Sequence, residues 1–295
     1  MQGQKERVLN VLSGLLHHHS LHDARKVRAM LSLVCVHMVS GSLALAATLN
    51  QQLKNFAISI ESIPNVALSS WFQGVIHFCR NELDMAIDHL SQAAETSYIM
   101  PRRASVDCLA GLALAYQATQ QTDKVSATMK RLLEYIHSLK DSTFLEIAHS
   151  CRARMSLMKG EAPFASGLPG FDTTSSGEAM FIFLEIPGIT QCRVLLAERS
   201  DESLREAEKR LQEYLRLSRT QHNTFQDIII LALQALIFEK QGRTDDALAV
   251  LETTVDLARP GGFIRPFVEL GPTMEGLLKR LAEKSAASGY IGQLL

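Results

Sequence analysis

The side chains best suited to capture a ligand are aromatic rings and a few charged or amide groups on the first helices of a recurring helical pattern. Aromatic rings supply contact area at a low entropic cost, and an Arg guanidinium can hold a carboxylate or a sugar hydroxyl. In a stack of helical hairpins, the first helices line a concave groove. The sequence predicts ligand or partner contacts in this groove from Trp71, Phe72, Phe78, Tyr98, Arg102, Arg103, Gln117, Glu185 and Arg193.

A purely structural role competes with this interpretation. Trp71 and Phe72 can equally fill the seam between two repeats, where large apolar side chains are common. Glu185 and Arg193 can equally form a structural ion pair. The sequence leaves both interpretations open.

Histidines near the N-terminus have a spacing that suits metal binding. His18 and His22 are one helical turn apart, with His17 and His19 beside them. Asp23 is the one nearby carboxylate, and no cysteine completes the set, so a solvated polar face is the favoured interpretation. We expect no metal and no cofactor. The chain also lacks a GxSxG nucleophile motif, and we expect no enzymatic activity.

The helices that position these side chains recur in a sequence repeat of about forty residues, which is typical of tetratricopeptide (TPR) hairpins. In each copy a turn is followed, five residues later, by a small residue, as in Asn81 to Ala86 and Gly242 to Ala247. A small side chain there lets the two helices of a hairpin approach closely. The marker recurs at intervals of 40, 39, 82 and 40 residues, at Ala46, Ala86, Val125, Ala207 and Ala247.

This repeat predicts an all-α fold: a TPR-like superhelix of about six helical hairpins in one domain, residues 1–295. The double interval places a further repeat near residue 165, but prolines and glycines predict an irregular loop at residues 163–177. Such a loop can be functional, or an insertion or deletion on a tolerant surface. A closing segment, residues 260–295, begins at Pro260-Gly261-Gly262 and contains an expected capping helix from Thr273 to Ser285.

Bulk composition narrows the function classes. The chain has 295 residues, 46% of them hydrophobic and 6% aromatic, which suits close-packed helices. Its formal net charge of -1 gives no bulk attraction to nucleic acid, and we expect no direct nucleic-acid binding. Five scattered cysteines without a CxxC pair predict reduced thiols, and no signal peptide is visible, so we expect a cytoplasmic protein.

One uncharged stretch is long enough to cross a bilayer. No Lys, Arg, Asp or Glu occurs from Ala29 to Leu53. A buried hairpin that turns at Gly41 explains the same lack of charge, and its serines and amide side chains favour that explanation. We therefore expect no membrane contact.

Three stretches go beyond generic TPR character. They are Arg103–Asp107 with Gly111–Ala118, Phe183–Pro187 with Arg193–Ala197, and Ala258–Glu269 with Met274 and Leu277–Leu278. In this order they resemble the helical-repeat domain of MalT-like regulators of the LuxR family. The resemblance spans nearly the whole chain.

The resemblance implies a sensor domain. Members of that family carry a nucleotide-binding ATPase, a helical superhelix that senses an inducer, and a helix-turn-helix that binds DNA. This sequence contains no GxxxxGK[ST] loop and resembles the middle part alone. We therefore expect a domain that binds a small-molecule inducer or a protein or peptide in its groove and controls transcription through attached or associated modules. The alternative is a stand-alone scaffold or adaptor for protein–protein interaction.

Overall fold

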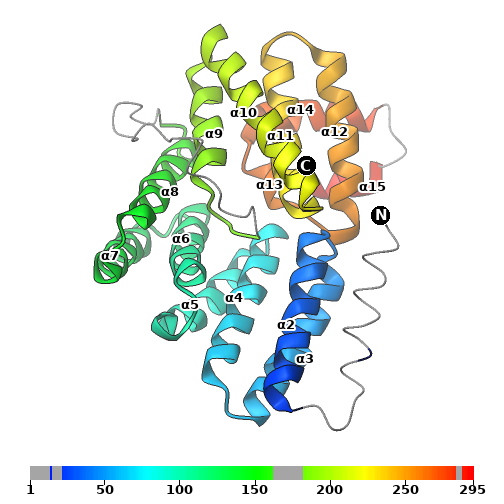
Figure 1. The fold of residues 1–295 in the computed structure, drawn as a ribbon. Helices are drawn as coiled ribbons and strands as arrows, with labels where there is room; N and C mark the ends of the chain where they lie inside the picture. Colours follow the sequence, from blue (N-terminus) through cyan, green and yellow to red (C-terminus); the bar gives the residue numbers. More distant parts are fainter. Residues whose placement is uncertain (1–13, 15–21, 162–181, 284–287) are drawn as a thin grey trace.

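The protein is built from helices that follow one another as antiparallel neighbours (Figure 1). The computed structural model describes residues 14, 22–161, 182–283 and 288–295. The helices are α2 (Asp23–Val39), α3 (Leu43–Ser59), α4 (Ile63–Cys79), α5 (Leu83–Glu95), η1 (Ser97–Ile99), α6 (Arg102–Ala118), α7 (Thr122–Leu139), η2 (Ser142–Phe144), α8 (Leu145–Met158), α9 (Pro187–Glu198), α10 (Asp201–Thr220), α11 (Thr224–Lys240), α12 (Thr244–Ala258), η4 (Arg259–Gly261), α13 (Arg265–Val268), α14 (Gly271–Ala282) and α15 (Ser288–Leu294).

The forty-residue repeat corresponds to helical hairpins, as expected. The hairpins are α2/α3, α4/α5, α6/α7, α9/α10 and α11/α12, and α8 stands where a further hairpin begins. Ala46, Ala86, Ala207 and Ala247 are fully buried on the second helices. The all-helical, TPR-like fold predicted from the sequence is therefore confirmed. The loop predicted at residues 163–177 lies outside the described residues.

One type of turn ends the first helix of the repeats. The second residue after the helix adopts a left-handed conformation, with φ of +74° at Gly41, +61° at Asn81 and +77° at Gly242. In the first of these turns the Ser42 amide donates to the His37 carbonyl at 2.8 Å, and the Gly41 amide donates to Met38 at 2.9 Å. This pair of hydrogen bonds is the Schellman arrangement, which closes a helix and reverses the chain.

The turn at Gly41 also accounts for the uncharged stretch from Ala29 to Leu53. This stretch forms parts of α2 and α3, which pack together as a hairpin. In the part of the chain that the structure describes, no helix combines the length and the apolar character that a bilayer crossing requires.

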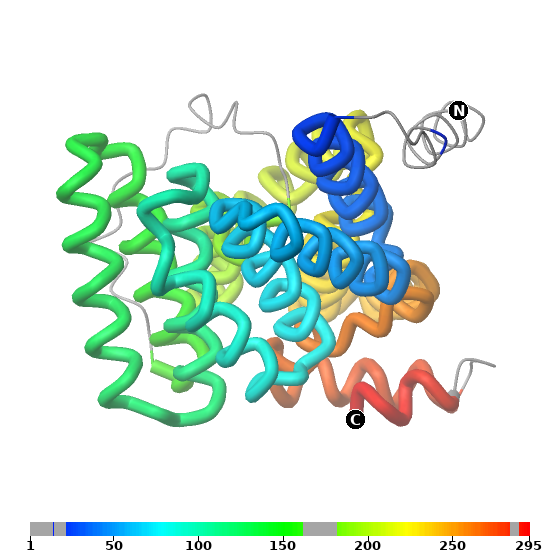
Figure 2. The backbone as a smooth tube through the Cα atoms, turned by 90° about the horizontal axis from the view of Figure 1, so that it is seen from below, coloured from blue at the N-terminus to red at the C-terminus, as the bar shows by residue number. Residues whose placement is uncertain are grey.

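The last helices return to the first, so the superhelix closes on itself (Figures 1 and 2). Helix α11 contacts α2, η4 contacts α3, and α13 contacts α4. The Ile264 amide donates to the Cys79 carbonyl at 2.9 Å, and Arg80 Nε donates to the Gly261 carbonyl at 3.2 Å. Repeats in an open array contact only their neighbours, so these contacts between distant repeats are additional to the repeat fold.

The C-terminal segment performs the capping role expected of it. Helix α14 packs on α12 and α13, and α15 packs on α14. The expected helix from Thr273 to Ser285 corresponds to α14, Gly271–Ala282. Phe263, Phe267 and Met274 are fully buried, so this segment belongs to the core.

Close helix packing makes a testable prediction at Gly74. A Cβ atom there would lie 2.5 Å from Leu90 Cγ on α5, so α4 and α5 must separate to admit it. We expect Gly74→Ala to lower the free energy of unfolding by about 1–3 kcal/mol. Gly276→Ala in α14 is the matched control, because a Cβ there meets nothing within 4 Å. It should stabilise the protein by about 0.5–1 kcal/mol. Urea denaturation of both variants measures the difference, and equal effects would contradict the packing.

Candidate functional site

The chain just before α9, residues 182–186, is an irregular segment whose backbone is held by buried and half-buried side chains. The Glu185 amide donates to Asp107 Oδ1 at 3.1 Å, and its carbonyl accepts from Arg103 at 2.6 Å. The Leu184 carbonyl accepts from Arg154 at 2.5 Å. These bonds replace the helix or sheet partners that buried backbone groups otherwise need. Side chains from α6 and α8 therefore fix the path of this segment.

Aromatic rings cover one end of this segment. Trp71 Nε1 donates to the buried Asp107 carboxylate at 3.2 Å. The Phe183 ring lies 6.1 Å from Trp71 between centroids, and the Arg103 guanidinium lies 3.8 Å above Phe183. Burial raises the pKa of Asp107, while Arg103 and the Glu185 amide act in the opposite direction.

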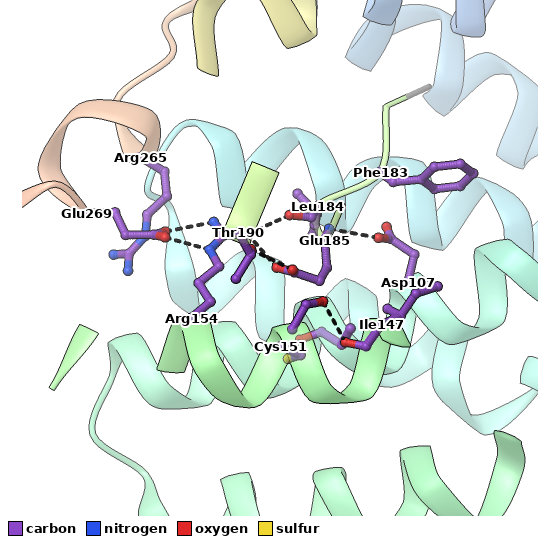
Figure 3. A network of polar contacts seen from close by, with 12 residues as sticks. Asp107, Ile147, Cys151, Arg154, Phe183, Leu184, Glu185, Thr190, Arg265 and Glu269 are labelled. Carbon is purple, nitrogen blue, oxygen red and sulfur yellow. Dashed lines mark hydrogen bonds and ion pairs between the residues drawn. The ribbon is translucent and has the colours of Figure 1, made fainter. Parts of the chain in front are cut away.

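The other end of the segment is an ion-pair cluster between α8, α9 and α13 (Figure 3). Arg154 donates to both oxygens of Glu269, from Nε at 2.5 Å and from Nη2 at 2.8 Å. It also donates from Nη1 to Glu185 Oε2 at 3.2 Å. Thr190 donates to the other Glu185 oxygen at 2.6 Å, and Arg265 Nε lies 3.2 Å from Glu269 Oε2.

The charges in this cluster control the ionisation of Glu269. Burial alone would raise the pKa of this carboxyl group. The attraction and hydrogen bonds of Arg154, with the charges of Arg193 and Arg265, outweigh burial and hold the pKa of Glu269 well below its usual range. Glu269 is therefore ionised throughout the physiological pH range.

A cavity of about 380 Å³ borders the cluster. Helices α8, α9 and α11 and the start of α14 surround it, and Arg154 and Glu269 form part of its wall. The rest of the lining is Leu157, Met158, Gly160, Glu161, Arg193, Leu196, Ala197, Arg199, Leu233, Leu236, Lys240, Leu270, Pro272 and Thr273.

Arg193 is the unusual member of this lining. Its side chain is buried, with 8% of the residue exposed, and its Nε atom has no hydrogen-bond partner. Across the described ranges of the chain, none of the ion pairs includes it. Burial and the repulsion of Arg154 lower the pKa of Arg193 to about 10, while the charges of Glu269 and Glu185 act in the opposite direction. Burying a guanidinium that forms no ion pair among the described residues and leaves its Nε donor unsatisfied is costly, so an added acceptor would stabilise it.

Some of the predicted groove residues lie elsewhere than expected. Trp71, Phe72 and Phe78 are each 2% exposed and fill the seams between helices, so the expectation that these rings line an open groove is corrected. The physical reason is the closure of the superhelix, because segment 182–186 and α13 cover the faces that an open stack would expose. Phe78 lies under the guanidinium groups of Arg154 and Arg265.

The remaining candidates divide into two groups. Tyr98 and Arg102 are exposed near the start of α6, and Gln117 is half-buried near its end. Arg103, Glu185 and Arg193 lie in the buried region just described. Glu185 and Arg193 do not form the ion pair that the alternative interpretation allowed; within the described residues Glu185 pairs with Arg154. Of the histidines, His22 accepts a hydrogen bond at the start of α2, and His17, His18 and His19 lie outside the described residues.

Sequence reasoning missed four residues around segment 182–186: Asp107 at one end, and Arg154, Arg265 and Glu269 in the cluster at the other end. Three of them lie inside the stretches that carried the family resemblance, and these stretches meet at segment 182–186. That convergence was the available signal for Asp107, Arg265 and Glu269. Arg154 gave no comparable signal, because α8 also contains Arg152, Glu146 and His149.

Replacement of Glu269 tests the cluster. Glu269→Gln leaves Arg154 partly unpaired, and we expect a loss of about 3–5 kcal/mol in unfolding free energy at pH 7. The native pKa of Glu269 lies below its ordinary value of 4.5, so its stabilising effect is complete above that pH and is lost as the pH falls below it. The stability of the wild type should therefore fall more steeply than that of Glu269→Gln below about pH 4.5.

The matched control is Glu275→Gln, which removes one charge from an exposed pair with Lys279. Its effect should stay within about 0.5 kcal/mol. Denaturation at a series of pH values compares the three proteins. Parallel pH profiles for the wild type and Glu269→Gln would show that Glu269 has an ordinary pKa.

Comparison with known proteins identifies the family. No curated protein matches the sequence. The family described as the MalT-like TPR region matches residues 1–284, and no ATPase or helix-turn-helix domain is found within the sequence. The match covers the hairpins, the ion-pair cluster and the cavity. The chain therefore belongs to the MalT-like TPR family.

Proposed function

We propose that this chain is the sensor domain of a MalT-like LuxR-type regulator, binding an inducer or partner and controlling transcription through attached or associated modules. One observation carries the proposal: the wall of the cavity includes Arg154 and Glu269, the pair that joins α8 to the closing segment. A molecule in the cavity would touch the contacts that hold the superhelix closed.

The mechanism follows from differential affinity. A ligand shifts a conformational equilibrium only as far as it binds one state better than the other. Closure brings α9, α11 and the start of α14 around one cavity, so a ligand that contacts all three favours the closed packing. The change in packing would reach the first hairpin, because α11 also contacts α2.

The charge of the chain supports an indirect action on DNA. With a net charge of -1, this domain offers no bulk attraction for phosphate backbones. We place it in the cytoplasm, with neither nucleic acid nor membrane as a direct partner and without catalysis of its own.

An adaptor role is the alternative, and the exposed residues near the start of α6 favour it. Tyr98 is 75% exposed, and Arg102 beside it is exposed as well. Tyr and Arg are frequent anchors of protein interfaces. In that case a peptide would bind to this edge, and the occupancy of the cavity would not affect its affinity.

Blocking the cavity separates the two roles. Ala197 lies on the cavity wall and is exposed, so Ala197→Trp would fill the cavity without disturbing the core. Ala249→Trp on α12 is the matched control, an exposed alanine outside the lining. We expect thermal shift and calorimetry against sugars, aromatic metabolites and small organic acids to find ligands of the wild type. Their affinity should fall at least about 10-fold in Ala197→Trp and remain unchanged in Ala249→Trp.

Two results would count against sensing. One is a set of ligands that binds both tryptophan variants equally. The other is an absence of ligands together with a protein partner whose affinity is the same for Ala197→Trp and the wild type but lower for Tyr98→Ala. The second result would establish the adaptor role.

A further inference from the structure

We propose that the cavity between α8, α9 and α11 binds a small molecule by an anionic head group, a carboxylate or a phosphate, which Arg193 holds. The proposal rests on the proposed sensing function and names the chemical class of its ligand.

The carboxylates near Arg193 are already engaged. Glu269 accepts from Arg154 at both oxygens and from Arg265 at one of them. Glu185 accepts from Thr190 at one oxygen and from Arg154 at the other. The cluster thus contains three buried guanidinium groups and two carboxylates, and Arg193 is the cation in excess. A ligand anion would supply the missing charge.

Other cations on the cavity wall increase its positive potential. Lys240 and Arg199 both line the cavity, and within the described chain neither forms an ion pair. Burial, with the repulsion of Arg199, lowers the pKa of Lys240. Glu161 is the lining carboxylate that does not pair with Arg154, and it is exposed to solvent. The cavity therefore carries an excess of positive charge at its walls.

The remaining wall suits an apolar body. Leu157, Leu196, Leu233 and Leu236 line the cavity together with Met158. Its volume of about 380 Å³ lies within the range of small-molecule sites. A guanidinium can bind a carboxylate or phosphate through two parallel N–H groups, which fixes the orientation of the head group. The ligand class is thus a metabolite with one anionic end and an apolar remainder.

Three probes of equal chain length test the head group: hexanoate, hexyl phosphate and hexanamide. Calorimetry with the wild-type protein should detect binding of at least one anion, and hexanamide should bind at least about 10-fold more weakly than that anion. Equal affinity for the amide and the anions would overturn the proposal. So would an absence of binding by both anions.

Variants test the role of Arg193. We expect Arg193→Met to weaken anion binding about 30-fold or more, the usual consequence of removing one partner of a buried charge pair. Arg216→Met, which removes an exposed arginine of α10, should leave the affinity unchanged. Anion affinity that survives in Arg193→Met would contradict the assignment.

Stability gives a second, independent readout. Arg193→Met removes a buried cation that forms no ion pair among the described residues and whose burial outweighs the attraction of Glu269 and Glu185. The melting temperature of this variant without ligand should therefore equal or exceed that of the wild type. A melting temperature well below that of the wild type would show that Arg193 is a structural residue. If Arg193→Met does not fold, the comparison of anions with hexanamide on the wild type decides the proposal.

Failure of this inference is distinguishable from failure of the sensing function. A neutral sugar or aromatic metabolite whose binding is lost in Ala197→Trp but kept in Arg193→Met would support the sensing function and contradict the proposal that the ligand is an anion. If neither neutral nor anionic ligands bind, both the sensing function and the proposed ligand class are contradicted.

Discussion

The buried Glu269 carboxylate lies between Arg154 and Arg265, and the closed shape of the superhelix depends on this contact. Arg154 belongs to α8 and Glu269 follows α13, so the pair joins the middle of the array to its end. Arg265 extends the connection, since it also donates to Asn81 Oδ1 at the turn after α4 at 3.2 Å. Glu269, together with Arg265, thus connects α8, α13 and the turn after α4, which are far apart in the sequence.

The same cluster explains why family-like residues are concentrated in three stretches. Arg103 and Asp107 on α6, segment 182–186 before α9, and Arg265 and Glu269 at α13 meet at one place. Arg103 and Asp107 bond the backbone of segment 182–186, where the helical repeat is interrupted, and Glu269 and Arg265 are connected to the segment through Arg154. Glu185 and Asp107 show no exposed surface at all. The motif residues therefore stabilise the fold, and the cavity beside them is the proposed site of ligand binding.

The repeat could be predicted from the sequence, but the closure could not. Small residues at a fixed distance after a turn report helix contact within one hairpin, and Ala86 and Ala247 are buried as that rule requires. Periodicity does not report the curvature that brings Gly261 beside Arg80, nor which face is covered afterwards. For this reason Trp71 was expected on an open groove and lies in the core. Arg193 was found as a candidate, but its burial with an unsatisfied Nε donor and without an ion pair among the described residues is visible only in three dimensions.

A double-mutant cycle on Arg154 and Glu269 tests the central claim most directly. Unfolding free energies would be measured for the wild type, Arg154→Met, Glu269→Met and the double variant. If the pair holds the superhelix closed, each single change leaves a buried charge only partly paired, and the loss in the double variant is smaller than the sum of the single losses by about 2 kcal/mol or more. Single effects that add within about 0.5 kcal/mol would show that the two residues act independently and would contradict the account.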